Sequence, residues 1–499
     1  MPACIELNDV IPRLPGSPFT SPINWHILAD EVWGVVGPNG SGKSLLAELV
    51  QGKIAVQSGN IRYPFLKDTE DANGFIHPAR QIKKIDFNSA YSLLDYRKLF
   101  YQQRFNNFAN EEIPLVRDIL KSENISEENL LLFRRFHLFD LMDRKLIHLS
   151  SGELRKFLIA KELLDNPRML IFDNPFIGLD EESRESLNEM FAFLLERRDL
   201  RLLLLAPSIE DLPACATHIL EMNDCYTVYR GKKSDYIAET DSASASFPEE
   251  PPTSVFPAIN WDDFTLEDRS FEGNEVVSMT NVDITYGKRI IQGNINWTVN
   301  KDEKWALLGP NGSGKSTLLS YIFADNPLAY TKNIRLFGRK RGTGESIWDI
   351  KQRIGFTSSE MHLYYRKNVD CLTVVASGFF DSIGLFRKCN ARQIHLAEKL
   401  LDIVRIPHLK NRSFLNVSSG EQRLVLFARA IIKNPELLIL DEPFHGLDEH
   451  NKKGCAAIVE SFARQAGKSL IHVTHRKEEI PSCIDHFMIL RQHETPSGE

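Results

Sequence analysis

The chain has 499 residues, of which 42% are hydrophobic and 25% charged, so it is long enough for two or three globular domains with buried cores. Its net charge of −7 and pI of about 6.1 make nucleic acid an unlikely main partner, although a local basic patch stays open. No stretch approaches the ~18 consecutive apolar residues of a membrane helix, and no basic N-terminal segment precedes an apolar run, so neither a span nor a signal peptide is predicted. Seven scattered cysteines form no CxxC pair, which favours reduced thiols over zinc or redox sites.

The predicted strands and helices alternate along the chain. Apolar runs suited to buried strands lead into glycine-rich loops, and helical patterns such as 44–50 and 316–323 follow those loops. This alternation predicts an α/β fold with a mostly parallel sheet, and the helix-rich segments further along each half predict a helical subdomain. The predicted strands are, in chain order, 32–37, 168–173, 200–206, 304–309, 437–441 and 469–475.

An internal repeat organises these elements. GPNGSGKS occurs at 37–44 and again at 309–316, 272 residues later, and SSGE occurs at 150–153 and again at 418–421, 268 residues later. An ordered series of such matches at a nearly constant offset indicates a duplicated unit of roughly 230 residues.

The boundaries between the copies follow from composition. We predict a first domain at 1–237, a linker at 238–275 and a second domain at 276–492. The linker is rich in Pro and Ser and has ten acidic residues against one basic residue, which is typical of a segment without its own core. Phe256, Trp261 or Phe264 could hold part of it against a domain.

GxxxxGK[ST] between a strand and a helix predicts a phosphate-binding loop in each copy. The glycines let backbone N–H groups approach phosphate oxygens at a helix N-terminus. Lys43 and Lys315 place a positive charge at the β- and γ-phosphates. The predicted loop residues are Gly37, Pro38, Asn39, Gly40, Ser41, Gly42, Lys43 and Ser44 in the first copy and Gly309, Pro310, Asn311, Gly312, Ser313, Gly314, Lys315, Ser316 and Thr317 in the second.

A Mg²⁺ site is predicted beside each loop. Ser44 and Ser316 offer hydroxyl oxygens to the ion, and Asp173 and Asp441 each end an apolar strand, where a carboxylate can hold the ion through water.

The SSGE segments point to a family. LSSGELRK at 149–156 and VSSGEQRL at 417–424 resemble the LSGGQ signature of ATP-binding cassette (ABC) proteins, with Ser in place of the first Gly. A helix that starts at such a loop directs its free N–H groups at an anion. The resemblance covers nearly the whole chain outside the linker. It implies two P-loop NTPase domains in tandem, with ATP and Mg²⁺ bound at two composite sites in an intramolecular sandwich, as a monomer or a dimer. The signature residues that would close the opposite site are Ser150, Ser151 and Gly152 in the first copy and Ser418, Ser419 and Gly420 in the second.

The resemblance also implies unequal catalysis. In the second copy Glu442 matches the general base, His475 the residue that contacts the γ-phosphate, and Lys315 the phosphate-loop lysine. Asn174 and Pro207 stand at the first two positions in the first copy, so that site is expected to bind ATP and cleave it slowly. The alternative is that these are neutral changes and that the water is positioned otherwise.

Two family positions are less regular. Tyr286 matches the aromatic residue that stacks on adenine, whereas the first copy has Leu14 there. Ser359 stands where the family has its Q-loop glutamine, and in the first copy Gln102 or Gln103 could fill that role.

Three segments, 336–356, 377–386 and 478–486, resemble one subfamily of bacterial tandem-cassette proteins, the ModF/PhrA type. This resemblance implies a cytoplasmic ATPase classed with molybdate transport, at the inner face of the plasma membrane when it meets a permease on another chain. Two alternatives remain: a soluble ATP-driven switch without a membrane partner, and a scaffold that closes on ATP and rarely hydrolyses it.

Overall fold

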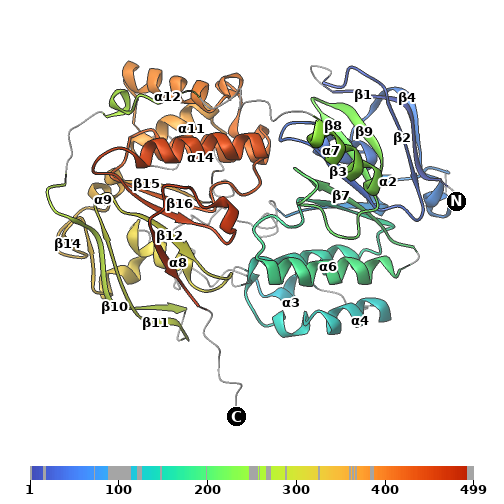
Figure 1. Ribbon diagram of the computed structural model, residues 1–499. Coiled ribbons are helices and arrows are strands. Elements are labelled where there is room, and N and C mark those ends of the chain that lie inside the picture. Colours follow the sequence, from blue (N-terminus) through green and yellow to red (C-terminus); the bar gives the residue numbers. More distant parts are fainter. Residues whose placement is uncertain are drawn as a thin grey trace, which may run out of the picture. The chain divides into compact units, whose positions relative to one another are not determined.

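The computed structural model divides into two compact units, with the described residues up to Ser246 in unit 1 and those from Pro257 onward in unit 2 (Figure 1). No described helix is long and apolar enough to cross a bilayer. The described residues are 3–14, 18–71, 74–87, 114–120, 126–146, 149–197, 199–246, 257, 259–265, 271–286, 289–323, 326–358, 361, 365, 368–381 and 387–491.

Unit 1 contains two sheets and the helices that accompany them. Its strands are β1 (Ala3–Pro12), β2 (Ile23–Leu28), β3 (Trp33–Val36), β4 (Val56–Arg62), β5 (Ile82–Asp86), β6 (Met169–Asp173), β7 (Arg201–Ala206), β8 (His218–Asn223) and β9 (Tyr226–Lys232). Its α-helices are α1 (Lys43–Val50), α2 (Pro78–Gln81), α3 (Val116–Ile119), α4 (Glu127–Arg135), α5 (Ser151–Leu163), α6 (Glu181–Leu195) and α7 (Lys233–Ser246).

Unit 2 repeats this plan. Its strands are β10 (Glu275–Tyr286), β11 (Arg289–Asn300), β12 (Lys304–Leu308), β13 (Ile334–Leu336), β14 (Arg339–Lys340), β15 (Ile354–Ser358), β16 (Leu437–Asp441), β17 (Ser469–Val473) and β18 (His486–Ile489). Its α-helices are α8 (Lys315–Ile322), α9 (Ile347–Arg353), α11 (Cys371–Ala376), α12 (Ala391–Ile403), α13 (Ser419–Ile431) and α14 (Glu449–Ala463).

The predicted α/β fold with two tandem P-loop domains is confirmed. In unit 1 the main sheet has the order β5-β6-β7-β3-β8-β9, parallel except for β9, and in unit 2 it has the order β15-β16-β17-β12-β18, parallel throughout. Each unit also carries a smaller antiparallel sheet, β2-β1-β4 or β11-β10-β13-β14. The carboxyl ends of parallel strands meet at one edge, which is where ligands bind in such sheets.

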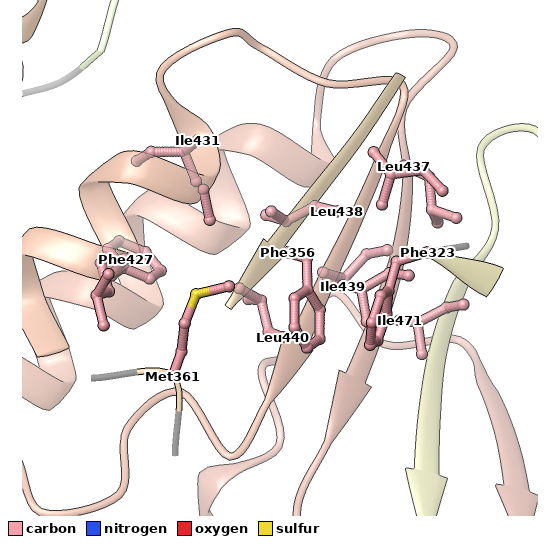
Figure 2. Packing of buried hydrophobic residues seen from close by; sticks show 14 of the residues in the cluster. Phe323, Phe356, Met361, Phe427, Ile431, Leu437, Leu438, Ile439, Leu440 and Ile471 are labelled. Carbon is pink, nitrogen blue, oxygen red and sulfur yellow. The ribbon is translucent and has the colours of Figure 1, made fainter. Parts of the chain in front are cut away.

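The core of unit 2 forms on both faces of its parallel sheet. In Figure 2, Leu438 and Leu440 of β16 point toward Phe427 on α13, and Ile439 points to the opposite side, toward Phe323. Every residue of β16 is buried. Strands covered on both faces are apolar at consecutive positions, which explains why the pattern here is a continuous run and not an alternation.

The predicted linker is partly structured. Its start, at residue 238, falls inside α7. Further on, Trp261 and Phe264 lie in the core of unit 2, and the Trp261 indole N–H donates to Ser461 Oγ at 3.0 Å. The expectation that these aromatic residues hold part of the segment against a domain is therefore met, while Phe256 lies outside the described residues.

Candidate nucleotide sites

The phosphate-loop sequences form the same structure in both units. Each loop leaves the carboxyl end of a parallel strand, β3 or β12, and leads into a helix, α1 or α8. The residue before each helix, Gly42 or Gly314, has a φ of 95° or 96°. Such left-handed values favour glycine. A Cβ at Gly37 would lie 2.0 Å from the Met222 carbonyl oxygen, so no larger residue fits there.

The loop lysines lie over their own loops. Lys43 Nζ donates to the Gly37 and Pro38 carbonyls at 2.5 and 2.8 Å, and Lys315 Nζ donates to the Gly309 and Pro310 carbonyls at 2.6 and 2.8 Å. Both lysines are buried. Each unit thus holds an ammonium group at the mouth of a loop whose first helical N–H groups have no intrahelical acceptor.

The predicted Mg²⁺ residues come together in both units. Ser316 Oγ donates to Asp441 Oδ2 at 3.3 Å, and Ser44 Oγ donates to Asp173 Oδ2 at 3.1 Å. A hydroxyl and a carboxylate oxygen are the donors that Mg²⁺ prefers, so the residues of unit 2 fit the ion. In unit 1 the Lys84 ammonium also lies 2.8 Å from Asp173 Oδ2, the oxygen that accepts from Ser44. The residues of unit 1 therefore do not fit a divalent cation, because a positive charge already lies at the oxygen that would hold it.

The two SSGE segments start helices through a capping box. Ser150 Oγ accepts from Glu153 N at 3.2 Å, and the Glu153 carboxylate accepts from Ser150 N at 2.8 Å, at the start of α5. Ser418 and Glu421 repeat this arrangement at the start of α13. The box satisfies two otherwise unpaired N–H groups and fixes where the helix begins. The predicted pairing of each segment with the phosphate loop of the other unit stays a prediction.

In unit 2 the predicted base is held between two histidines. His475 Nδ1 lies 3.1 Å from Glu442 Oε1, and His445 Nδ1 lies 3.4 Å from Glu442 Oε2. The carboxylate is 12% exposed. Glu442 has a φ of 51°, which turns the chain sharply at the end of β16. The sheet order β16-β17-β12 brings this residue, His475 and the phosphate loop to the same edge.

These contacts set the charge of the carboxylate. Burial alone would raise the pKa of Glu442, but hydrogen bonds from His445 and His475 outweigh burial and hold the pKa well below its usual range. Burial lowers the pKa of His445 to about 4, so this ring is neutral at pH 7 and donates from Nδ1. The Glu442 carboxylate is therefore ionised and able to accept a proton.

Unit 1 lacks this arrangement at every position. Asn174 follows Asp173 with the same backbone turn, at a φ of 53°, and its amide donates to Asp173 Oδ1 at 3.1 Å. Ile177 stands where unit 2 has His445, and Pro207 stands where unit 2 has His475. No carboxylate or imidazole occupies the place of the base or of its partners, although the backbone is the same.

Several predicted residues cannot be placed. Ser359, Gln102 and Gln103 lie outside the described residues, as does the Tyr286 side chain, although its backbone ends β10. Leu14 is described and packs against the core of unit 1. The adenine-stacking and Q-loop predictions therefore remain predictions.

Two site residues were missed at the sequence level. His445 stands in the segment PFHGLD where the first copy has PFIGLD, and Lys84 stands in β5 at the position that Phe356 occupies in the second copy. Both were detectable as charged or titratable residues at positions where one copy is apolar. The sequence does not reveal which side chain each one reaches.

Comparisons with known proteins identify ATP-binding proteins of ABC transporters as similar to this chain. Residues 20–177 and 293–445 match a sequence family described as ABC transporter. The ABC transporter ATP-binding protein ModF of Escherichia coli is 34% identical over 469 residues, which cover 92% of this chain and 91% of ModF. The uncharacterized ABC transporter ATP-binding protein C323.04 of Schizosaccharomyces pombe is 28% identical over 485 residues, or 94% of each chain.

Solved structures show the same fold. A model of ribosome-bound archaeal Pelota and ABCE1 contains a chain that superposes with a TM-score of 0.56 at 17% identity and covers 93% of this chain and 74% of that one. At this identity the likeness concerns the fold alone.

Proposed function

The chain belongs to the ABC transporter family and is an ATP-binding cassette protein, and from that premise we propose that it is an ATPase whose unit 2 hydrolyses ATP while unit 1 mainly holds it. The observation that carries the proposal is the buried, ionised Glu442 between two histidines, against Asn174, Ile177 and Pro207 in unit 1.

The proposed reaction uses residues of unit 2. Lys315 binds the β- and γ-phosphates, and Glu442 orients a water toward the γ-phosphorus. The water oxygen bonds to that phosphorus as the bond to the β,γ-bridging oxygen breaks. One water proton passes to the Glu442 carboxylate, and ADP and phosphate leave.

Two further groups support this step. The buried His475 Nε2 makes no hydrogen bond within the described residues, and it is the proposed contact for a γ-phosphate oxygen. Mg²⁺, which Ser316 and Asp441 would hold, supplies positive charge that neutralises the phosphates.

Closure of the two units on ATP is proposed by analogy with the family. Lys43, Ser44 and Asp173 would face Ser418, Ser419 and Gly420, and Lys315, Ser316 and Asp441 would face Ser150, Ser151 and Gly152. An ATP that touches both units only in the closed state would shift the population toward closure, and hydrolysis in unit 2 would reopen that half.

The enzymatic part of the proposal is tested by steady-state phosphate release from the purified chain. Lys315→Ala is expected to abolish turnover, because it removes the phosphate-loop lysine of the hydrolysing unit. Lys43→Ala, the matched change in unit 1, is expected to leave part of the activity. Greater loss from Lys43→Ala than from Lys315→Ala would reverse the assignment.

For the biological role, we propose a cytoplasmic ATP-binding subunit of a transporter whose permease is a separate chain. The 34% identity with the transporter protein ModF supports this role, and the ModF/PhrA resemblance suggests molybdate as the substrate class. The test is capture of partners by the Glu442→Gln chain in ATP, with Lys315→Ala as the control that does not close. Recovery of a permease only with Glu442→Gln would support the role, and soluble partners alone would favour an ATP-driven switch.

A further inference from the structure

Unit 1 has a lysine at the place where its metal is expected. Lys84, on β5, lies with its ammonium 2.8 Å from Asp173 Oδ2, the same oxygen that accepts from Ser44 Oγ at 3.1 Å. The side chains of Lys84 and Asp173 are only 13% and 10% exposed. A partly buried ammonium therefore already lies beside the two oxygens that would hold a divalent ion.

The register of the two sheets shows that this lysine is particular to unit 1. Lys84 lies opposite Ile171 in the pairing of β5 with β6, and Phe356 lies opposite Ile439 in the pairing of β15 with β16. The two partners differ by the offset of 268 that relates the copies, so Lys84 and Phe356 occupy equivalent positions.

The neighbours of Lys84 and Phe356 also differ, polar in unit 1 and aromatic in unit 2. Phe356 is buried and stacks on Phe323, with 4.0 Å between ring centroids (Figure 2). Gln51 takes the place of Phe323 in unit 1, at the offset of 272, and donates to the Ile82 carbonyl at 3.0 Å. Unit 2 thus packs an aromatic pair beside its metal residues, while unit 1 has an amide and an ammonium there.

A divalent cation and this ammonium exclude one another. Placing Mg²⁺ between Ser44 and Asp173 would set like charges side by side in a poorly solvated site, where their repulsion is strong. Moving Lys84 away would break a buried ion pair and leave its ammonium without that carboxylate. An ammonium beside the phosphates can itself neutralise part of their charge, as a phosphate-loop lysine does.

We propose that Lys84 takes the place of the divalent cation in unit 1, so that this site binds metal-free nucleoside triphosphate while unit 2 binds the Mg²⁺ complex. The inference rests on the proposed binding of ATP in unit 1 and deepens it. A site without the metal also lacks a group that hydrolysis needs, which agrees with the loss of the base at Asn174.

The test measures ATP binding to the full-length chain carrying Lys315→Ala, which disables the site of unit 2. Radiolabelled ATP is titrated by equilibrium dialysis in EDTA and, separately, in Mg²⁺. With Lys84 present, the two dissociation constants are expected to agree within about threefold. Lys84→Met is expected to weaken binding in EDTA by at least about tenfold and to regain affinity in Mg²⁺, since one lost charge interaction of about 1.4 kcal/mol changes an equilibrium tenfold.

Two further variants make the result specific. Lys83→Met, on the same strand, removes a lysine that pairs with Asp165 at 3.2 Å. It should bind ATP in EDTA and in Mg²⁺ as tightly as the chain that carries Lys315→Ala alone. Lys84→Arg keeps a cation and should keep binding in EDTA. In the chain with Lys315 intact, metal analysis after Mn²⁺ and ATP loading is expected to find one Mn²⁺ per chain, and two with Lys84→Met.

Two kinds of result would overturn the proposal for Lys84. At least a tenfold loss of ATP binding in EDTA with Lys84 present, or two Mn²⁺ per chain in the unmodified protein, would show that Lys84 only fills the site until the metal arrives. No ATP binding in either EDTA or Mg²⁺ would overturn the proposed binding function of unit 1 itself, and this inference with it.

Discussion

At the residue scale, the proposed hydrolysis depends on a carboxylate, Glu442, whose charge is fixed by its neighbours. Glu442 is buried, which would favour the neutral acid, yet two imidazoles keep it ionised. An ionised carboxylate at this position can accept a hydrogen bond from water and orient it. In unit 1 the amide of Asn174 donates to Asp173 and cannot take that role.

The first prediction concerns this difference. Glu442→Gln should lower kcat by about 10²- to 10⁴-fold, the usual contribution of general-base catalysis, because an amide cannot accept the proton. Asn174→Ala changes the matched position of unit 1 and should leave kcat within about twofold for the same reason. Steady-state phosphate release at saturating ATP measures both. Equal losses in the two variants would refute the assignment of hydrolysis to unit 2.

The second prediction concerns His445, whose Nδ1 lies 3.4 Å from Glu442 Oε2. His445→Ile installs the residue of the first copy, Ile177. It should reduce kcat by about 10- to 150-fold with little change in KM, because a hydrogen bond to a charged group is worth roughly 1.5–3 kcal/mol. His445→Gln keeps a donor and should recover part of the rate. A rise in KM without a change in kcat would mean that His445 acts in ATP binding instead.

At the element scale, the described residues 259–265 of the segment between the copies are part of unit 2. The single-turn helix Trp261–Phe264 places two aromatic rings in the core of that unit, and Asp263 pairs with Lys399 at 2.5 Å. An acidic, Pro-rich composition conceals such an anchor, because composition averages over the whole segment, whose described buried residues are Ile259, Trp261 and Phe264.

The third prediction follows from this anchor. Trp261→Ala should destabilise unit 2 by roughly 3–5 kcal/mol, the usual effect of removing a large aromatic side chain from a core. Asp262→Ala, at the exposed neighbouring position, is the control and should change the stability of unit 2 little. Denaturant unfolding of the two variants tests the difference. Similar stability in both would show that the segment is not part of the folded unit.

A second element-scale feature is a buried histidine in the central strand β17. His472 is fully buried, and neither ring nitrogen makes a hydrogen bond within the described residues. Burial lowers its pKa from 6.5 to about 3. As the pH falls below 6.5, the unfolded chain binds a proton at this residue and the folded chain does not, so folding stability falls.

The fourth prediction uses the first copy, which has Leu204 at this position. The unmodified chain should lose about 2 kcal/mol of stability between pH 7.5 and pH 5 through His472, since 1.36 kcal/mol corresponds to each pH unit below the unfolded pKa. His472→Leu should lack this part of the loss. His395→Leu, which changes an exposed histidine, should show the same loss of stability as the unmodified chain. The same pH dependence of unfolding in all three proteins would mean that His472 is protonated in the folded state.

At the scale of the whole molecule, the two units share the core of their fold and differ at residues to which we assign roles in ATP hydrolysis. Three of the differences follow the carboxyl ends of strands and remove a titratable group from unit 1, while a fourth, inside β5, adds a lysine. A duplicated fold can diverge in this way, because loops at strand ends change without disturbing the core.

Much of this arrangement was predictable from the sequence. The repeat, the phosphate loops and the apolar runs predicted the two domains and their parallel sheets, because local patterns fix strands and loops. The contact of Lys84 with Asp173 was not predictable, since it joins two strands whose alignment depends on the folded sheet. His445 was visible as a difference from Ile177, but its partner Glu442 became evident only from the geometry.

The central claim is that the two units treat ATP differently, and one single-turnover measurement tests it most directly. The chain is mixed rapidly with Mg²⁺ and two equivalents of γ-labelled ATP, at concentrations that fill both sites, and released phosphate is followed over time. About half of the bound ATP is expected to be cleaved in a fast phase in unit 2, while the other half, in unit 1, stays intact much longer. Cleavage of all the bound ATP in one phase would contradict the account.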